Sequence, residues 1–203
     1  MGIISSIKKA ITGNEQLDRP EPVHHDPQPV SDSFYIDTLE SDRAEKDRFF
    51  RSSPHSPIAD RVNFTGLAYY PPDPAYRYKL AINQADQPEP LTFQTNTGDE
   101  RTYHRIGTVE FGVDGESATL ALYRADHHDA LFLPFRDATS GSETYGAGRY
   151  LEPQLLSDGR VLVDFNLAYN PFCAYSSSYS CPLPPIENHL TVAIRAGEKD
   201  FKK

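Results

Sequence analysis

From residue 58 onward, hydrophobic and polar residues alternate in short runs that are separated by turn-forming residues. Tyr76–Ile82 alternates aromatic with basic residues, and the run Val109–Val113 meets Asp114-Gly115 before Leu120 and Leu122 continue the alternation. A period of two is typical of strands with one buried face, because successive side chains point to opposite faces. Asp-Gly between two such runs is a strong hairpin signal, so the chain predicts a β-hairpin at this point.

The remaining runs extend this pattern to most of the chain. Asp158-Gly159 repeats the hairpin signal between Leu155-Leu156 and Val161-Leu162-Val163. Further strands are expected at Phe64–Tyr70, Leu91–Thr95, Leu131–Leu133 and His189–Ile194. Eight or nine short strands at close spacing, with no helix between them, favour an antiparallel architecture. We therefore predict a mainly β domain, an antiparallel barrel or sandwich with an N-terminal helix.

The first part of the chain has a different pattern. Ile3, Ile4, Ile7 and Ile11 recur at helical spacing and predict a short amphipathic helix. Peripheral membrane contact through residues 1–12 is one interpretation of it, and docking on a partner is another. Prolines among polar residues predict a flexible linker up to Asp32, and a second helix is expected at Ser33–Arg51 with Ser33 as its cap. We therefore divide the chain into a helix and linker at 1–32 and one β-rich domain at 33–203.

Composition narrows the classes of partner. The chain has 203 residues, 38% of them hydrophobic, and a formal net charge of −9. This charge disfavours nucleic acid as a partner, because phosphate backbones bind basic surfaces. No apolar run approaches the length of a transmembrane helix. The start of the chain lacks the apolar core of an export signal, and free thiols suit a reducing compartment. We therefore expect a cytoplasmic protein.

Candidate chemistry is concentrated between Leu131 and Asn188, where charged and amide residues stand among aromatic residues. Polar groups held by a packed scaffold are what a binding site requires. Arg136, Asp137 and Thr139 follow an expected strand, and Glu143, Tyr145 and Arg149 follow around Gly146 and Gly148. Two guanidinium groups beside two carboxylates suit a small anion. The alternative is that these groups close a buried hydrogen-bond network that braces a long loop.

The segment from Asp164 to Tyr175 adds further polar residues. Interpreted as a strand, it places Asp164 and Asn166 on one face and Tyr169 on the other. Such a polar face either contacts solvent or lines a barrel interior that holds a polar ligand. Asn170-Pro171 then ends the strand and presents Cys173.

Known catalytic and metal motifs do not account for this segment. Cys173 and Cys181 are the two cysteines of the chain, and two soft ligands are too few to fix a zinc site, so we assign no metal and name no cofactor. The chain contains no phosphate-binding GxxxxGK[ST], no GxGxxG after a strand, no HExxH and no CxxC. An enzyme, a hydrolase or isomerase, remains an alternative in which Asp137 or Glu143 is the general base or Cys173 the nucleophile.

Four stretches of the chain resemble a known family. They are GLAYYPPDPAYRY (66–78), LFLPFRDATSGSETYGAGRYLE (131–152), VDFNLAYNPFCAYSSSYSCPLPPIEN (163–188) and IRAGEK (194–199). They are similar to the domain-of-unknown-function family 1684, an uncharacterised group found mainly in bacteria and archaea. The similarity extends roughly from Phe34 to the C-terminus and leaves out the first helix and the linker. In this sequence it includes the polar residues discussed above, together with Asp164, Cys181 and Glu187. The resemblance implies no activity.

Our leading hypothesis is a domain that binds a small polar or anionic molecule. A structural or interaction module is a third possibility, beside the enzyme. The expected ligand-binding residues are Arg136, Asp137, Thr139, Glu143, Tyr145, Arg149, Asn166, Tyr169, Asn170 and Cys173.

Overall fold

The computed structural model describes residues 26–28, 30–126 and 128–201. The predicted helix at residues 1–12 and most of the predicted linker lie outside the described residues. Within the part of the chain that is described, no helix is both long enough and apolar enough to span a membrane.

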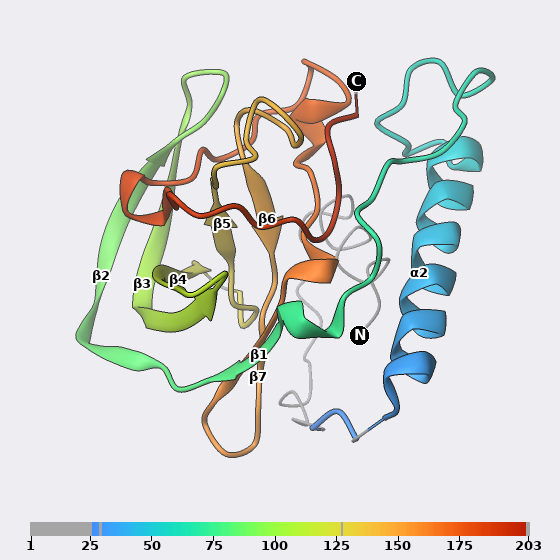
Figure 1. Ribbon diagram of the computed structural model, residues 1–203. Helices are drawn as coiled ribbons and strands as arrows, with labels where there is room; N and C mark the ends of the chain where they lie inside the picture. Colours follow the sequence, from blue (N-terminus) through green and yellow to red (C-terminus); the bar gives the residue numbers. More distant parts are fainter. Residues whose placement is uncertain (1–25, 29, 127, 202–203) are drawn as a thin grey trace, which may run out of the picture.

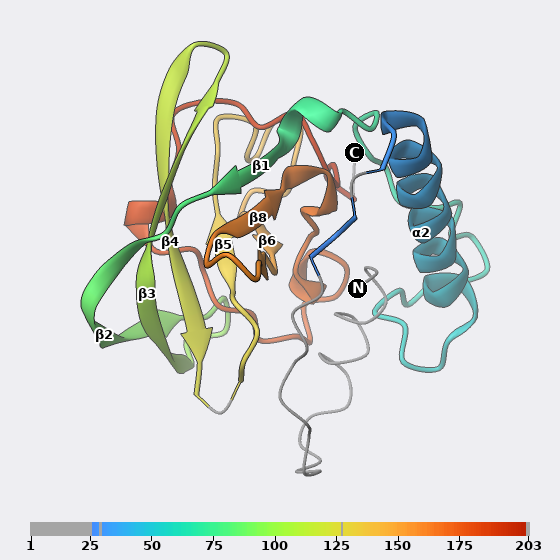
Figure 2. The same ribbon diagram turned by 90° about the horizontal axis from the view of Figure 1, so that it is seen from below.

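Helix α2 (Asp32–Ser52) lies along one side of the β-sheet body (Figures 1 and 2). The prediction that Ser33 caps it was wrong, because the extended residue Ser31 is the N-cap and its hydroxyl accepts from the Phe34 amide. The helix ends at Ser52, before Pro54. Its buried residues recur every three or four positions, which turns one face to the body, and they are Tyr35, Leu39, Arg43, Lys46 and Phe50. That face therefore carries two cations into the interior.

The eight strands of the described chain form three antiparallel sheets. The largest sheet has the order β2 (Asn83–Gln94), β3 (Glu100–Val113) and β4 (Glu116–Ala125). The second has the order β1 (Arg77–Leu80), β8 (Val161–Asp164) and β7 (Gln154–Leu155), and the third pairs β5 (Leu133–Phe135) with β6 (Arg149–Leu151). The sheets do not close into a barrel but lie in a sandwich-like arrangement. The predicted fold class, mainly β with an N-terminal helix, is confirmed.

Both hairpins that Asp-Gly predicted are present. Asp114 and Gly115 have φ angles of 51° and 83° and join β3 to β4, where Val113 pairs with Glu116. Positive φ at both central residues is the conformation that a two-residue hairpin turn needs. Around Gly159, β7 pairs with β8 through Leu155 and Val161. Short-range turn chemistry therefore determines these two connections.

The main hydrophobic core lies between the sheets. It joins β3 and β4 to β5, β8 and the C-terminal segment through buried residues that include Val109, Leu120, Phe135, Phe165 and Ile194. In both views the sheet β2-β3-β4 and helix α2 lie on opposite sides of the body (Figures 1 and 2). Strands therefore cover one side of the body, and on the other side lies a helix face that buries two cations beside its hydrophobic residues.

Two segments that the pattern predicted as strands do not form them. Phe64–Tyr70 and His189–Ile194 each contain one isolated bridge residue, Tyr69 and His189. The reason is that their backbone groups bond to scattered partners rather than to one neighbouring strand. The Leu190 amide donates to the carbonyl of Arg136, and the Ile194 amide donates to the carboxylate of Asp137.

The interpretation of Asp164–Tyr169 as a strand was also wrong. Strand β8 ends at Asp164, whose carboxylate accepts from the Asn166 amide and starts a 3-10 helix at Phe165–Leu167. Asp164 and Asn166 therefore contact each other across a cap instead of sharing a strand face. Short helices of the same kind occur at Pro74–Tyr76, Phe172–Ala174 and Ile186–Asn188.

Candidate functional site

Arg149 is fully buried at the start of β6 and binds the C-terminal segment. Its guanidinium donates to the carbonyls of Ile194 (2.8 Å), Ala196 and Glu198 (3.2 Å), and it lies 3.5 Å from the carboxylate of Asp137. Burial lowers the pKa of Arg149 and the charge of Asp137 opposes that shift. The Nη donors are therefore used within the protein, and they hold a segment that has no strand partner.

Asp137 and Thr139 complete this buried cluster. The Asp137 carboxylate accepts from the Ile194 amide (2.6 Å), from the Thr139 hydroxyl (2.9 Å) and from the Ser140 hydroxyl (3.2 Å). The hydroxyls of Thr139 and Thr144 lie 2.9 Å apart. These contacts fix the turn at residues 137–144 and join it to the C-terminal segment, as a bracing network does.

Asn170 belongs to a second buried cluster, under helix α2. Lys46 of the helix forms an ion pair with Glu198, and the two side chains are 1% and 2% exposed. The other carboxylate oxygen of Glu198 accepts from the Asn170 amide (2.9 Å) and from the hydroxyl of Tyr175 (2.6 Å). The ammonium of Lys46 also lies 5.5 Å from the ring centroid of Tyr169. This cluster attaches the helix to the C-terminal segment.

Asn166 belongs to a third cluster, at the end of β8. Its side chain accepts from the amide of Asp73 (2.9 Å) and donates to the Asp73 carbonyl (2.7 Å) and to Asp164 (3.1 Å). Asp164 also accepts from the Tyr35 hydroxyl (2.9 Å) and from Nε of Arg77 (3.1 Å). Burial raises the pKa of Asp164, and the hydrogen bonds from Tyr35 and Asn166 oppose that shift.

Glu143 and Arg136 are less buried than the residues of these clusters. Glu143 pairs with Arg195 (3.0 Å) and accepts from the Tyr70 hydroxyl (2.9 Å), and the hydrogen bond from Arg195 holds the pKa of Glu143 below its usual value. Arg136 is half-buried, and its backbone pairs with residues Asn188 and Leu190.

Tyr145 and Cys173 meet at another place. The Tyr145 hydroxyl donates to Sγ of Cys173 at 3.7 Å, and the Cys173 amide donates to Sγ of Cys181 at 3.4 Å. The contacts of the ten predicted residues divide most of them among several hydrogen-bonded clusters, and the clusters of Arg149 and Asn170 meet at Glu198. Asp137, Thr139 and Arg149 are together, and so are Tyr145 and Cys173, whereas Asn166 and Asn170 belong to two further clusters.

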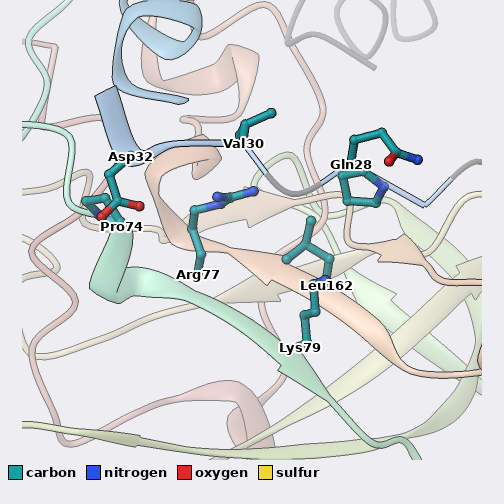
Figure 3. A pocket seen from close by; sticks show the side chains of 8 residues that line it. Gln28, Val30, Asp32, Pro74, Arg77, Lys79 and Leu162 are labelled. Atoms are coloured by element: carbon teal, nitrogen blue, oxygen red, sulfur yellow. The ribbon is translucent and has the colours of Figure 1, made fainter. Parts of the chain in front are cut away.

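A hollow of about 310 Å³ lies between strands β1 and β8 and the segment that leads into the start of helix α2 (Figure 3). The guanidinium of Arg77 lies 4.0 Å from the ring centroid of Tyr35, and its Nε donates to Asp164. In Figure 3 this guanidinium extends toward Val30 rather than along the strand. The hollow is lined by Pro27, Gln28, Val30, Asp32, Pro74, Arg77, Lys79 and Leu162.

Sequence reasoning did not select Arg77 or Lys79, although the alternation over Tyr76–Ile82 contained the signal. On β1, Tyr78 and Leu80 pack against the main core, so the period of two turns Arg77 and Lys79 to the opposite face. Leu162 of β8 is the partner of Lys79 in the register and lines the same hollow. What the sequence could not reveal is that helix α2 begins beside this face.

A second hollow, about 420 Å³, has a mixed polar and apolar lining and carries one charged side chain, Asp60. Its lining also includes Ile58, Phe64, Tyr175 and Phe201. A hollow whose one charged side chain is a carboxylate does not suit an anion. Among the residues that the structure describes, no group of three or more His, Cys, Asp or Glu side chains could hold a metal ion.

Comparisons with known proteins agree with the family resemblance. The model of the family described as "Protein of unknown function (DUF1684)" matches residues 62–199. A solution NMR structure of an uncharacterized protein from gene locus rrnAC0354 of Haloarcula marismortui is 42% identical in sequence, with a TM-score of 0.65. The match covers 84% of this chain and 97% of that chain. No functionally curated protein matches the chain.

Proposed function

The chain belongs to the DUF1684 family of proteins of unknown function, and we propose that this member binds a small anion, a carboxylate or a phosphate monoester, at Arg77. The observation that carries the proposal is the position of the Arg77 guanidinium, which is held by Asp164 and Tyr35 and lines the hollow between β1, β8 and the segment that leads into helix α2.

Arg77 is prepared for binding by its surroundings. Asp164 accepts from Nε, and the ring of Tyr35 covers one face of the guanidinium. Asp164 is itself held by Tyr35 and Asn166, which was among the predicted ligand-binding residues. A guanidinium that is already ordered loses less conformational entropy when it binds, and its planar donors suit carboxylate and phosphate. In this proposal Asn166 acts through Asp164 and does not contact the ligand.

The size and lining of the hollow favour a small ligand with an apolar part. A volume of about 310 Å³ is at the lower end of the range for ligand pockets. Leu162, Val30 and Pro74 supply apolar surface beside the cation. A ligand with one acidic group and a short hydrocarbon part would use both features.

The local charges favour a ligand with few negative charges. Arg77 and Lys79 attract an anion, and so does the positive end of the dipole of helix α2. Asp32 is part of the same lining and repels it, and Asp164, which pairs with Arg77, offsets part of the charge of that guanidinium. A multiply charged nucleotide would meet Asp32 and the net charge of −9, so we expect a monocarboxylate or phosphate monoester to bind better.

The other predicted residues are not ligand contacts in this proposal. The Nη donors of Arg149 bind backbone carbonyls, and Asp137 accepts from groups of the protein. Arg136 and Glu143 are closer to solvent. An anion site beside them is the alternative to the site at Arg77, and the titration must distinguish the two. An enzyme that uses Cys173 as nucleophile is a second candidate, because the pKa of this thiol is lowered to about 7.

The test is a titration with acetate, butyrate, phenyl phosphate and ATP, followed by calorimetry and by thermal unfolding. Arg77→Gln should weaken the binding of butyrate and of phenyl phosphate by about 10- to 100-fold, the magnitude of a hydrogen bond to a charged group. Lys79→Gln, at an exposed residue, should weaken it by a few-fold without affecting the fold. Arg48→Gln removes the same charge from an exposed position of helix α2 outside the hollow and is the matched control.

Two results would contradict the proposal. One is the absence of saturable binding for both butyrate and phenyl phosphate. The other is an equal loss in Arg77→Gln and Arg48→Gln, which would mean that only the net charge matters. Loss of binding in Arg136→Gln, with Arg77→Gln unaffected, would move the site to the surface beside Glu143.

A further inference from the structure

The two cysteines of the chain lie in contact although eight positions separate them. The Cys173 amide donates to Sγ of Cys181, and the two thiols are hydrogen-bond partners of each other. Both thiols are free, and the residues are 8% and 7% exposed. Two hydrogen bonds with Asn96 fix the backbone of Cys181. The Cys181 backbone amide donates to the side-chain oxygen of Asn96 at 2.7 Å, and the Asn96 backbone amide donates to the Cys181 carbonyl at 3.1 Å.

We propose that Cys173 and Cys181 form a reversible intramolecular disulfide when the protein meets hydrogen peroxide. The Cys173 thiolate attacks one peroxide oxygen, the O–O bond breaks, and Cys173 becomes a sulfenic acid with release of water after protonation. The Cys181 sulfur then attacks the Cys173 sulfur, the S–O bond breaks, and a second water leaves with the proton of Cys181. Two thiols are oxidised, and one peroxide is reduced to two waters.

The surroundings assign the two roles. The hydrogen bond from Cys181 and the one from Tyr145 lower the pKa of Cys173 to about 7, against the opposing effect of burial. The hydrogen bond with Cys173 and burial raise the pKa of Cys181. Burial raises the pKa of Tyr145 as well, so its hydroxyl keeps the proton that it donates to Cys173. The Tyr145 hydroxyl donates to Sγ of Cys173 and so stabilises its thiolate, and we therefore assign the first attack to Cys173.

Burial selects the oxidant and protects the disulfide. Cys173 is 8% exposed, so a small oxidant such as peroxide should reach its sulfur faster than a larger reagent does. Tyr175 holds the segment between the two cysteines. The Tyr175 hydroxyl donates to Glu198, and the ring of Tyr175 packs edge-on against that of Phe50 in helix α2, with 5.2 Å between the ring centroids. A disulfide would close a short loop whose two ends are already in place, which stabilises the folded state by restricting the unfolded chain.

The experiment is intact-mass analysis of the full chain after peroxide treatment, under native conditions and in urea. We expect a loss of two hydrogens in the native protein, reversed by dithiothreitol, and a rise of roughly 5–10 °C in its melting temperature. Cys181→Ser should accumulate a sulfenic acid on Cys173 that dimedone traps, because no second thiol resolves it. Cys173→Ser should form no disulfide, and its remaining Cys181 should form the dimedone-trapped sulfenic acid more slowly than Cys173 does in Cys181→Ser. Iodoacetamide labelling of Cys173 should rise at a lower pH than is usual for a cysteine thiol, because its pKa is lowered.

Several outcomes would overturn the inference. Oxidation of Cys173 to a sulfinic acid in the wild type would mean that Cys181 does not reach it in time. Disulfide-linked dimers would mean that the thiols react between molecules. A melting temperature that falls on oxidation would show that the two sulfurs meet only after local unfolding. These results are independent of anion binding at Arg77, since Cys173→Ser should leave that binding unchanged.

Discussion

Replacement of Arg149 by methionine tests whether this buried guanidinium holds the C-terminal segment or awaits a ligand. Methionine retains much of the length and flexibility of the side chain and removes its donors. The substitution leaves the carbonyls of Ile194, Ala196 and Glu198 without the hydrogen bonds that Arg149 provides, and it removes the cation beside Asp137. Arg195→Met is the matched control, because Arg195 is an exposed arginine paired with the carboxylate of Glu143.

The expected cost follows from burial. Each buried acceptor that loses its donor costs about 1–3 kcal/mol, and removing one partner of a buried ion pair costs about 3–5 kcal/mol. These effects overlap, since Asp137 keeps its hydrogen bonds from Thr139 and Ile194. We therefore expect Arg149→Met to lower the free energy of unfolding by about 4–6 kcal/mol. Arg195→Met should lower it by at most about 1 kcal/mol, as for an exposed pair.

Urea unfolding followed by far-UV circular dichroism measures both values, and tyrosine fluorescence is a second probe because the chain has 12 tyrosines and no tryptophan. A loss for Arg149→Met within about 1 kcal/mol of that for Arg195→Met would refute the structural role. Arg149→Lys restores the charge but not the planar set of donors, so it should recover only part of the stability. Full recovery would show that charge alone matters.

Two other predictions concern the C-terminal segment. Lys46→Met and Glu198→Gln should each lower the free energy of unfolding by about 3–5 kcal/mol. The double variant should lower it by clearly less than the sum of the two, because it leaves no unpaired buried charge. Additive losses in a urea double-mutant cycle would contradict the pairing. Gly197→Ala should lower the melting temperature far more than Gly159→Ala. Both glycines have positive φ, but a Cβ at Gly197 would lie 2.6 Å from the carbonyl oxygen of Ala168, whereas one at Gly159 meets open space; equal losses in thermal unfolding would remove this steric argument.

Local sequence signals predicted the parts of the fold that local chemistry determines. Asp-Gly at 114–115 and at 158–159 joins strands that pair directly, and helix α2 was expected within one residue of its observed ends. Hydrophobic alternation could not show that His189–Ile194 lies without a strand partner. That segment depends on hydrogen bonds with residues distant in the sequence, among them the Arg149 side chain, which donates to Ile194, and the Ala138 amide, which donates to Val192. Side-chain donors of this kind leave no periodic signal.

The candidate site was harder to predict for the same reason. The segment from Leu131 to Asn188 was selected because it mixes charged and aromatic residues, and most of those charged and amide groups bond to each other or to the backbone. The pair of Lys46 and Glu198 brings together residues 152 positions apart, with nothing in their neighbours to indicate it. Arg77 stood in an ordinary alternating strand. Its environment depends on helix α2, which is distant in the sequence, and so the hollow appears only in three dimensions.

The most direct test of anion binding at Arg77 is an NMR titration of the folded protein with butyrate and then with phenyl phosphate, observing backbone amides and arginine Nε–H groups. Binding at Arg77 should give saturable shifts centred on Arg77 Nε and on the amides around Val30 and Leu162, with Arg149 and Arg136 unchanged. Saturable shifts centred on Arg136 or Arg195, or shifts that grow linearly with ligand at every exposed cation, would contradict it.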